Sequence, residues 1–242
     1  MKSDPEHSKS GAPRNILIVD DHPLIRSGLK QLIARHGDLN VSGEGGSPAE
    51  AFAELARQVP DLLLADMSMP GRSGFEFIKD VLALHPGLPI LILSMHDEGL
   101  YAERVLRAGA RGFIMKDAGG ERLITAIRQV LNGQVYVSPG IAARLLESLT
   151  GHRPRGSTSP IETLSDREFE VLRLIGQGRG TRDIAEQLHL SPKTVDVHRA
   201  HIRTKLKLKN AVALVSYAIR WVESETAALP RNNAEAEIPG AS

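Results

Sequence analysis

Short apolar runs that alternate with amphipathic stretches over the first 134 residues constrain the fold more than any other feature of this chain. The apolar runs lie at residues 15–20, 40–44, 61–65, 89–94 and 111–115. Between them, apolar residues recur at helical spacing at 23–36, 48–58, 74–85, 99–108 and 120–132. Alternating strands and helices predict an α/β fold, with a five-stranded parallel, doubly wound, flavodoxin-like sheet and helices on both faces.

Polar or charged residues stand at the carboxyl ends of four of these runs. Asp20 and Asp21 end or follow the first run, Asp66 follows the third, Ser94 closes the fourth and Lys116 follows the fifth. In an open parallel sheet the carboxyl ends of the strands share one edge, where ligands bind. Three carboxylates, a hydroxyl and an ammonium at that edge predict a site for a divalent metal ion and a phosphoryl group.

The second half of the chain has the pattern of a small all-α domain. Ser165 and Ser191 each have the features of a helix start, the first with a capping-box glutamate and the second with a proline after it. Helical segments are also indicated at 181–188 and 210–222. We therefore expect a separate four-helix, helix-turn-helix domain.

The composition of the segment between the two domains indicates where the domain boundary lies. Residues 150–160 lack large apolar side chains and are rich in Gly, Pro and Ser, which is typical of a flexible linker. The expected segments are a disordered N-terminus (1–13), the α/β domain (14–134), a short helix and linker (135–161), the helical domain (162–224) and a disordered tail (225–242).

Charge and cysteine content narrow the class of protein. Residues 1–150 carry a net charge of −2 and residues 163–224 a net charge of +4, which suggests two modules with different partners. No run approaches the roughly 20 apolar residues that span a bilayer. The absence of cysteine excludes disulfides and cysteine-ligated metal. These features predict a cytoplasmic protein that does not contact a membrane.

The residues at the strand ends resemble the receiver domain of two-component response regulators. The matching pieces are Val19-Asp20-Asp21-His22-Pro23, Ala65-Asp66 with Met69-Pro70-Gly71, Leu93-Ser94 and Met115-Lys116. The resemblance implies that Asp66 accepts a phosphoryl group, paired with Lys116. It also implies a Mg²⁺ ion bound by Asp21 and Asp66 directly, by Asp20 through water and by the Ser68 carbonyl. Ser94 and Phe113 occupy the positions that, in this family, shift when the phosphoryl group arrives.

The segments Leu164–Ile175, Ile184-Ala185 and Leu190–His198 resemble the LuxR-type helix-turn-helix. The resemblance implies that the helix over 191–205 lies in the major groove of DNA. Val195, Ile202 and Leu206 are expected to face the domain core. The residues expected to contact DNA are Lys193, Thr194, Asp196, Val197, Arg199, Ala200, Arg203, Lys205 and Lys209.

Together the two resemblances indicate a NarL/FixJ-type response regulator. The implied function is phosphorylation-dependent transcriptional regulation rather than enzymatic catalysis. The expected partners are a sensor histidine kinase, a double-stranded DNA operator with inverted repeats, a second copy of the chain when phosphorylated, and RNA polymerase. The long linker motivates a further expectation, that the unphosphorylated receiver masks the recognition helix.

Several alternatives remain open at this point. The chain could bind DNA independently of phosphorylation, with a receiver that only dimerises. A phosphohydrolase that uses an aspartyl phosphate would need a second aspartate two residues after the nucleophile, where Ser68 stands. His22 is expected to cap a helix, and His96 either tunes the lifetime of the phosphoryl group or is an exposed bystander. The apolar stripe of Leu214, Val215, Ala218 and Val222 forms either a dimer contact or internal packing.

Overall fold

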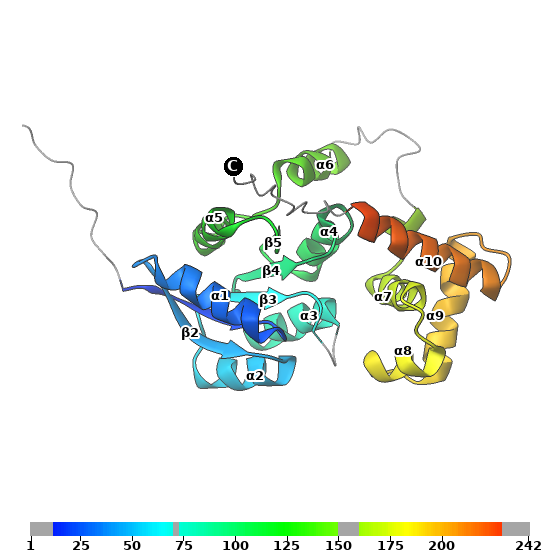
Figure 1. The fold of residues 1–242 in the computed structure, drawn as a ribbon, viewed down its shortest axis with the longest axis horizontal. Helices are drawn as coiled ribbons and strands as arrows, with labels where there is room; N and C mark the ends of the chain where they lie inside the picture. The colour runs from blue at the N-terminus through cyan, green and yellow to red at the C-terminus, as the bar shows by residue number, and fades with distance from the viewer. Residues whose placement is uncertain (1–11, 70–72, 150–159, 229–242) are drawn as a thin grey trace, which may run out of the picture.

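The computed structural model describes residues 12–69, 73–149 and 160–228 (Figure 1). The predictions of disorder for the N-terminus, the linker and the tail fall almost entirely outside these ranges and stay predictions. Residues 225–228 are an exception, because the last helix, α10 (Ala211–Ala228), continues through them. That helix is therefore longer than the predicted 210–222.

The sheet has the predicted architecture. Its five strands are parallel and stand in the order β2-β1-β3-β4-β5. They are β1 (Arg14–Val19), β2 (Leu39–Gly45), β3 (Leu62–Asp66), β4 (Ile90–Ser94) and β5 (Gly112–Met115). Every residue of β3 and β4 is buried, as expected for central strands covered on both faces.

Helices cover the two faces of the sheet in separate groups. They are α1 (Pro23–Ala34), α2 (Pro48–Arg57), α3 (Gly74–Leu84), α4 (Glu98–Ala108) and α5 (Gly120–Leu131). Helices α1 and α5 share one core cluster with the strands, whereas α2, α3 and α4 share the other. The predicted short helix, α6 (Pro139–Leu149), lies against α4, and the backbone N–H of Ser138 before it donates to Glu98 Oε1 at 2.7 Å.

The helical domain lies beside this α/β domain (Figure 1). It consists of a 3₁₀ turn, η1 (Pro160–Thr163), then α7 (Asp166–Gly176), α8 (Thr181–Gln187), α9 (Pro192–Lys205) and α10. The predicted capping box is present, since Ser165 Oγ accepts from Glu168 N and Glu168 accepts from Ser165 N. Glycine is required at Gly176, because a Cβ there would lie 2.4 Å from the Ala218 carbonyl oxygen of α10.

The described part of the chain contains no helix that is both long enough and apolar enough to cross a membrane. The sheet domain and the helical domain share a core cluster on the α3–α4 side, so the two domains are docked. The fold class predicted from the sequence, an α/β sheet domain followed by a small helical domain, is confirmed.

Candidate functional site

Strand register brings the predicted site residues to one edge of the sheet. Val19 lies opposite Ala65, so the residues that follow them along the chain, Asp20 and Asp66, are neighbours. Ser94 pairs with Met115, and the backbone N–H of Lys116 donates to the Ser94 carbonyl at 2.8 Å. Four segments that are far apart in sequence therefore meet at the carboxyl edge, where open parallel sheets bind ligands.

Lys116 holds two of the carboxylates together. Its Nζ lies 2.7 Å from Asp20 Oδ2 and 3.1 Å from Asp66 Oδ2. Asp20 and Asp66 are only 1% and 4% exposed, so both charges are removed from bulk water. A buried charge is tolerated when it is paired, and the Lys116 ammonium provides that pairing.

Burial and the neighbouring charges shift the pKa values at this edge. Burial raises the pKa of Asp66, and the charge of Asp20 adds to the rise, while Lys116 opposes it. For Lys116, burial works against the charged form, but its hydrogen bond to Asp20 and the charge of Asp66 leave its pKa above the usual value. A second cation beside Asp66 would favour its ionised form.

A divalent cation fits the donor set. Asp20, Asp21, His22 and Asp66 each offer a ligand atom, and these atoms lie within 4.8 Å of one another. Three of the four donors are carboxylates, the hard oxygen ligands that Mg²⁺ prefers. The acidic edge therefore fits the magnesium ion that the sequence implies.

His22 belongs to this cluster, although the sequence favoured a capping role for it. Its side chain makes no capping hydrogen bond to α1. Its Nδ1 lies 2.7 Å from Asp21 Oδ1, and its backbone N–H donates to Asp20 Oδ1 at 2.8 Å. The only signal in the sequence was its position directly after the two aspartates.

The residues expected to shift are buried. Ser94 and Phe113 have no solvent exposure, and Phe113 packs in the core on the α3–α4 side of the sheet. Ser94 Oγ accepts a hydrogen bond from the backbone N–H of His96 at 3.0 Å. Ser68 Oγ lies 2.7 Å from His96 Nε2. His96 is half-buried and contacts the other domain, so the exposed-bystander interpretation of it is wrong.

The helix-turn-helix presents the predicted α9 surface. Ser191 Oγ accepts from the backbone N–H of Thr194 at 3.0 Å, which caps the helix. Val195 and Ile202 are fully buried, as predicted, and Leu206 is partly buried. Among the residues expected to contact DNA, Thr194 is partly buried, and the exposed ones are Lys193, Asp196, Val197, Lys205 and Lys209.

Some residues of the expected DNA surface are partly buried or already paired within the domain. Lys205 Nζ lies 2.6 Å from Glu168 Oε2, so Lys205 forms an ion pair within the domain with the capping glutamate of α7. Arg199 is partly buried and its Nη1 lies 3.5 Å from Thr181 Oγ1. Ala200 and Arg203 are partly buried, while Lys209 is exposed.

The apolar stripe on α10 serves mainly internal packing. Leu214 and Ala218 have no solvent exposure, and Val222 borders Gly176 of α7. Val215 is partly buried. The expectation of a dimer face made of Leu214, Val215, Ala218 and Val222 is therefore wrong for the two buried residues, since a fully buried side chain cannot meet a partner. The exposed large apolar residues described on α10 are Val212 and Ile219.

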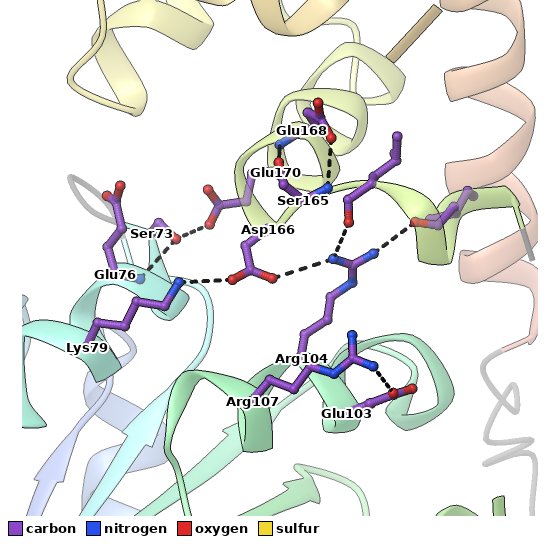
Figure 2. Close-up of polar contacts among 12 residues, drawn as sticks. Ser73, Glu76, Lys79, Glu103, Arg104, Arg107, Ser165, Asp166, Glu168 and Glu170 are labelled. Carbon is purple, nitrogen blue, oxygen red and sulfur yellow. Dashed lines mark hydrogen bonds and ion pairs between the residues drawn. The ribbon is translucent and has the colours of Figure 1, made fainter. Parts of the chain in front are cut away.

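The two domains contact each other through the start of α7 (Figure 2). Lys79 Nζ lies 3.1 Å from Asp166 Oδ2, and Ser73 Oγ donates to the Glu170 carboxylate. Arg104 donates to the carbonyl oxygens of Ile161 and Leu164, at 2.8 Å each. These contacts leave Lys193, Asp196 and Val197 of α9 exposed. The expectation that the receiver covers the recognition helix is therefore wrong for this arrangement.

Comparisons with known proteins match both domains. Residues 16–128 match the response regulator receiver domain, and residues 162–218 match the bacterial regulatory proteins of the luxR family. The oxygen regulatory protein NreC of Staphylococcus carnosus is 38% identical over 209 residues, which cover 85% of this chain and 96% of NreC. NreC of Staphylococcus haemolyticus is 39% identical over the same shares.

A solved structure is similar over most of the chain. RcsB from Salmonella enterica serovar Typhimurium, bound to the promoter rprA with the phosphomimetic BeF₃⁻, has a TM-score of 0.66 and 28% sequence identity. The match covers 86% of this chain and 98% of RcsB.

Proposed function

Because this chain belongs to the NarL/FixJ-type response regulators, which join a receiver domain to a LuxR-type helix-turn-helix domain, we propose that a phosphoryl group on Asp66 controls the affinity of the protein for DNA. The observation that carries the proposal is the meeting of Asp20, Asp66 and Lys116 at one buried edge. A paired ammonium and a cation site beside a carboxylate suit phosphoryl transfer to that carboxylate.

Each residue at the edge has a role in the proposed transfer. An Asp66 oxygen forms a new P–O bond while the P–N bond of a phosphohistidine in the sensor kinase breaks, and the donor nitrogen keeps the electron pair. The Nζ of Lys116 pairs with the phosphoryl oxygens. Mg²⁺, held by Asp21, Asp66 and the Ser68 carbonyl and by Asp20 through water, would offset the repulsion between the carboxylates and the phosphoryl group.

The DNA-binding role is assigned to the exposed face of α9. Lys193 and Thr194 lie in its first turn, where a helix attracts phosphate, and Asp196 and Val197 lie one turn along toward the base edges. We propose a double-stranded operator with inverted repeats, bound by a homodimer. A structure of two RcsB dimers bound to two parallel DNAs supports the choice of a dimer. RNA polymerase is a further proposed partner, and DNA as the target implies a cytoplasmic location.

The proposed protein is a regulator and not an enzyme that turns over phosphate esters. Its relatives are transcription regulators, and Ser68 stands where an aspartyl-phosphate hydrolase would need a second aspartate. Incubation with p-nitrophenyl phosphate and Mg²⁺ should release no p-nitrophenol above the rate of an Asp66→Asn variant.

Operator binding should strengthen when beryllofluoride, a phosphoryl mimic, is added with Mg²⁺. Coupling between two sites in proteins is commonly about 5–150-fold in affinity, so we expect at least a fivefold tighter Kd by fluorescence anisotropy. Operator DNA would first be selected from genomic fragments that the mimic-treated protein retains. An equal Kd with and without the mimic would favour the phosphorylation-independent alternative.

Lys193 should contribute affinity without sequence preference. Replacing it with alanine removes one phosphate contact, so the slope of log K against log salt concentration should become shallower by about 0.9. The loss should be similar for operator and unrelated DNA, measured over roughly 50 to 200 mM salt, where such slopes are resolved. Lys30→Ala, a change of equal charge on the receiver next to Glu44, is the control and should leave the slope unchanged.

A further inference from the structure

His96 stands where the receiver meets the DNA-binding domain. Its backbone N–H donates to Ser94 Oγ at 3.0 Å. Its Nε2 lies 2.7 Å from Ser68 Oγ and 2.7 Å from Arg173 Nη1, and Arg173 belongs to α7 of the other domain. One residue therefore contacts the hydroxyl at the end of β4, the loop that follows Asp66, and the helical domain.

The chemistry of the contact fixes the state of the ring. A guanidinium can only donate hydrogen bonds, so Nε2 must accept and the ring proton resides on Nδ1. Burial, together with the charges of Arg173 and Lys116, lowers the pKa of His96 to about 4. In the contact with Arg173, His96 therefore accepts through Nε2.

Packing connects this contact to the rest of the domain interface. The His96 ring stacks on Tyr101 of α4, with ring centroids 4.7 Å apart and planes 16° apart. Tyr101 meets Phe169 of α7 edge-on at 5.0 Å, and the guanidinium of Arg104 lies 4.5 Å from the centre of the Phe169 ring. Arg104 also donates to the backbone that precedes α7, as Figure 2 shows. A displacement of His96 would therefore be transmitted to α7 through side chains in direct contact.

We propose that His96 couples the orientation of the Ser94 hydroxyl to the docking of α7 through Arg173. The inference rests on the proposed function, in which Ser94 turns toward a phosphoryl group on Asp66. When Ser94 Oγ turns away, the His96 N–H loses its acceptor and the segment that holds the imidazole against Arg173 loses its anchor. The docked domain therefore favours the present orientation of the Ser94 hydroxyl. It opposes the orientation that Ser94 takes when Asp66 carries a phosphoryl group.

Reciprocity makes this coupling measurable in the opposite direction. If the phosphoryl group weakens docking through His96, then loss of the Arg173 contact must tighten the binding of a phosphoryl mimic by the same factor. If His96 only filled space, the effect of an Arg173 substitution on the affinity for the mimic would be the same with and without His96. The two cases are separated by a double-mutant cycle.

The cycle uses the full chain and two shape-conserving substitutions. Arg173→Met keeps the aliphatic stem but removes the donor, and His96→Phe keeps the stacking on Tyr101 but removes the acceptor. The affinity for beryllofluoride with Mg²⁺ would be measured by isothermal titration calorimetry for the wild type, both single variants and the double variant. Arg179→Met, at an exposed arginine beyond α7, is the charge-matched control.

We expect Arg173→Met to tighten beryllofluoride binding by about fivefold or more when His96 is present. In the His96→Phe background the same change should alter the affinity by less than about twofold, the additivity limit for uncoupled sites. Arg179→Met should match the wild type. An equal effect of Arg173→Met in both backgrounds, or no effect in either, would overturn the coupling while leaving the proposed function intact. Failure of the wild type to bind beryllofluoride would overturn both.

Discussion

Replacing Asp66 with asparagine should reduce labelling by radioactive acetyl phosphate to background. The amide lacks the anionic oxygen that forms the P–O bond, and it removes a carboxylate from the proposed Mg²⁺ site. The substitution leaves the other groups at the edge in place, including Asp20 and Lys116, which pair at 2.7 Å in the wild type. The measurement is label incorporated per chain with Mg²⁺ present, after denaturing gel electrophoresis.

Asp61→Asn is the matched control for this experiment. Asp61 precedes β3, whereas Asp66 ends it, so the same chemical change is made at the opposite edge of the sheet. Asp61 is engaged there with Arg14 and with the backbone N–H of Asn15. Its variant should label as the wild type does. Label that persisted on the Asp66→Asn variant would place the phosphoryl group on another residue and reject the assignment.

The features that were predicted from the sequence are those that depend on local pattern. Apolar runs of the right length, each followed by a polar residue, are sufficient to predict parallel strands and a shared edge. Asp20, Asp66 and Lys116 meet because the strands are parallel and in register, and this follows once the fold class is known. Capping signals at Ser165 and Ser191 similarly predicted where α7 and α9 begin.

The features that escaped prediction depend on contacts between distant segments. An apolar stripe on a helix shows which face is buried but not against what, and α10 buries Leu214 and Ala218 against its own domain. A lysine on a recognition helix looks available for phosphate, yet Lys205 pairs with Glu168. The contact between His96 and Arg173 joins residues 77 positions apart in the chain. No spacing rule in the sequence relates such pairs.

The docked arrangement also changes how control by phosphorylation is understood. Masking would require the receiver to lie over Lys193, Asp196 and Val197, but these residues are exposed. The receiver instead holds the start of α7, through Arg104, Lys79 and Ser73. Docking in this form restrains the position of the helical domain rather than access to its DNA surface. Regulation would then act on whether two such domains can align on one operator.

Replacing Val195 with aspartate should abolish operator binding and leave phosphorylation of Asp66 intact. Val195 has no solvent exposure and lies on α9, inside the small helical domain. A buried, unpaired carboxylate costs several kcal/mol, and a domain of this kind has a free energy of unfolding of only about 5–15 kcal/mol. We expect the domain to lose its packing and the operator affinity to fall by about 100-fold or more, the equivalent of roughly 3 kcal/mol.

Val212→Asp makes the same chemical change at an exposed position of the same domain, since Val212 is 73% exposed on α10. It should preserve the helical circular dichroism signal and at least most of the DNA affinity. Label from acetyl phosphate should be normal in both variants, because the groups that surround Asp66 come from the sheet edge. If Val195→Asp bound operator as tightly as Val212→Asp does, α9 would not be the DNA-binding element. If it lost its label as well, the two domains would not fold as separate units.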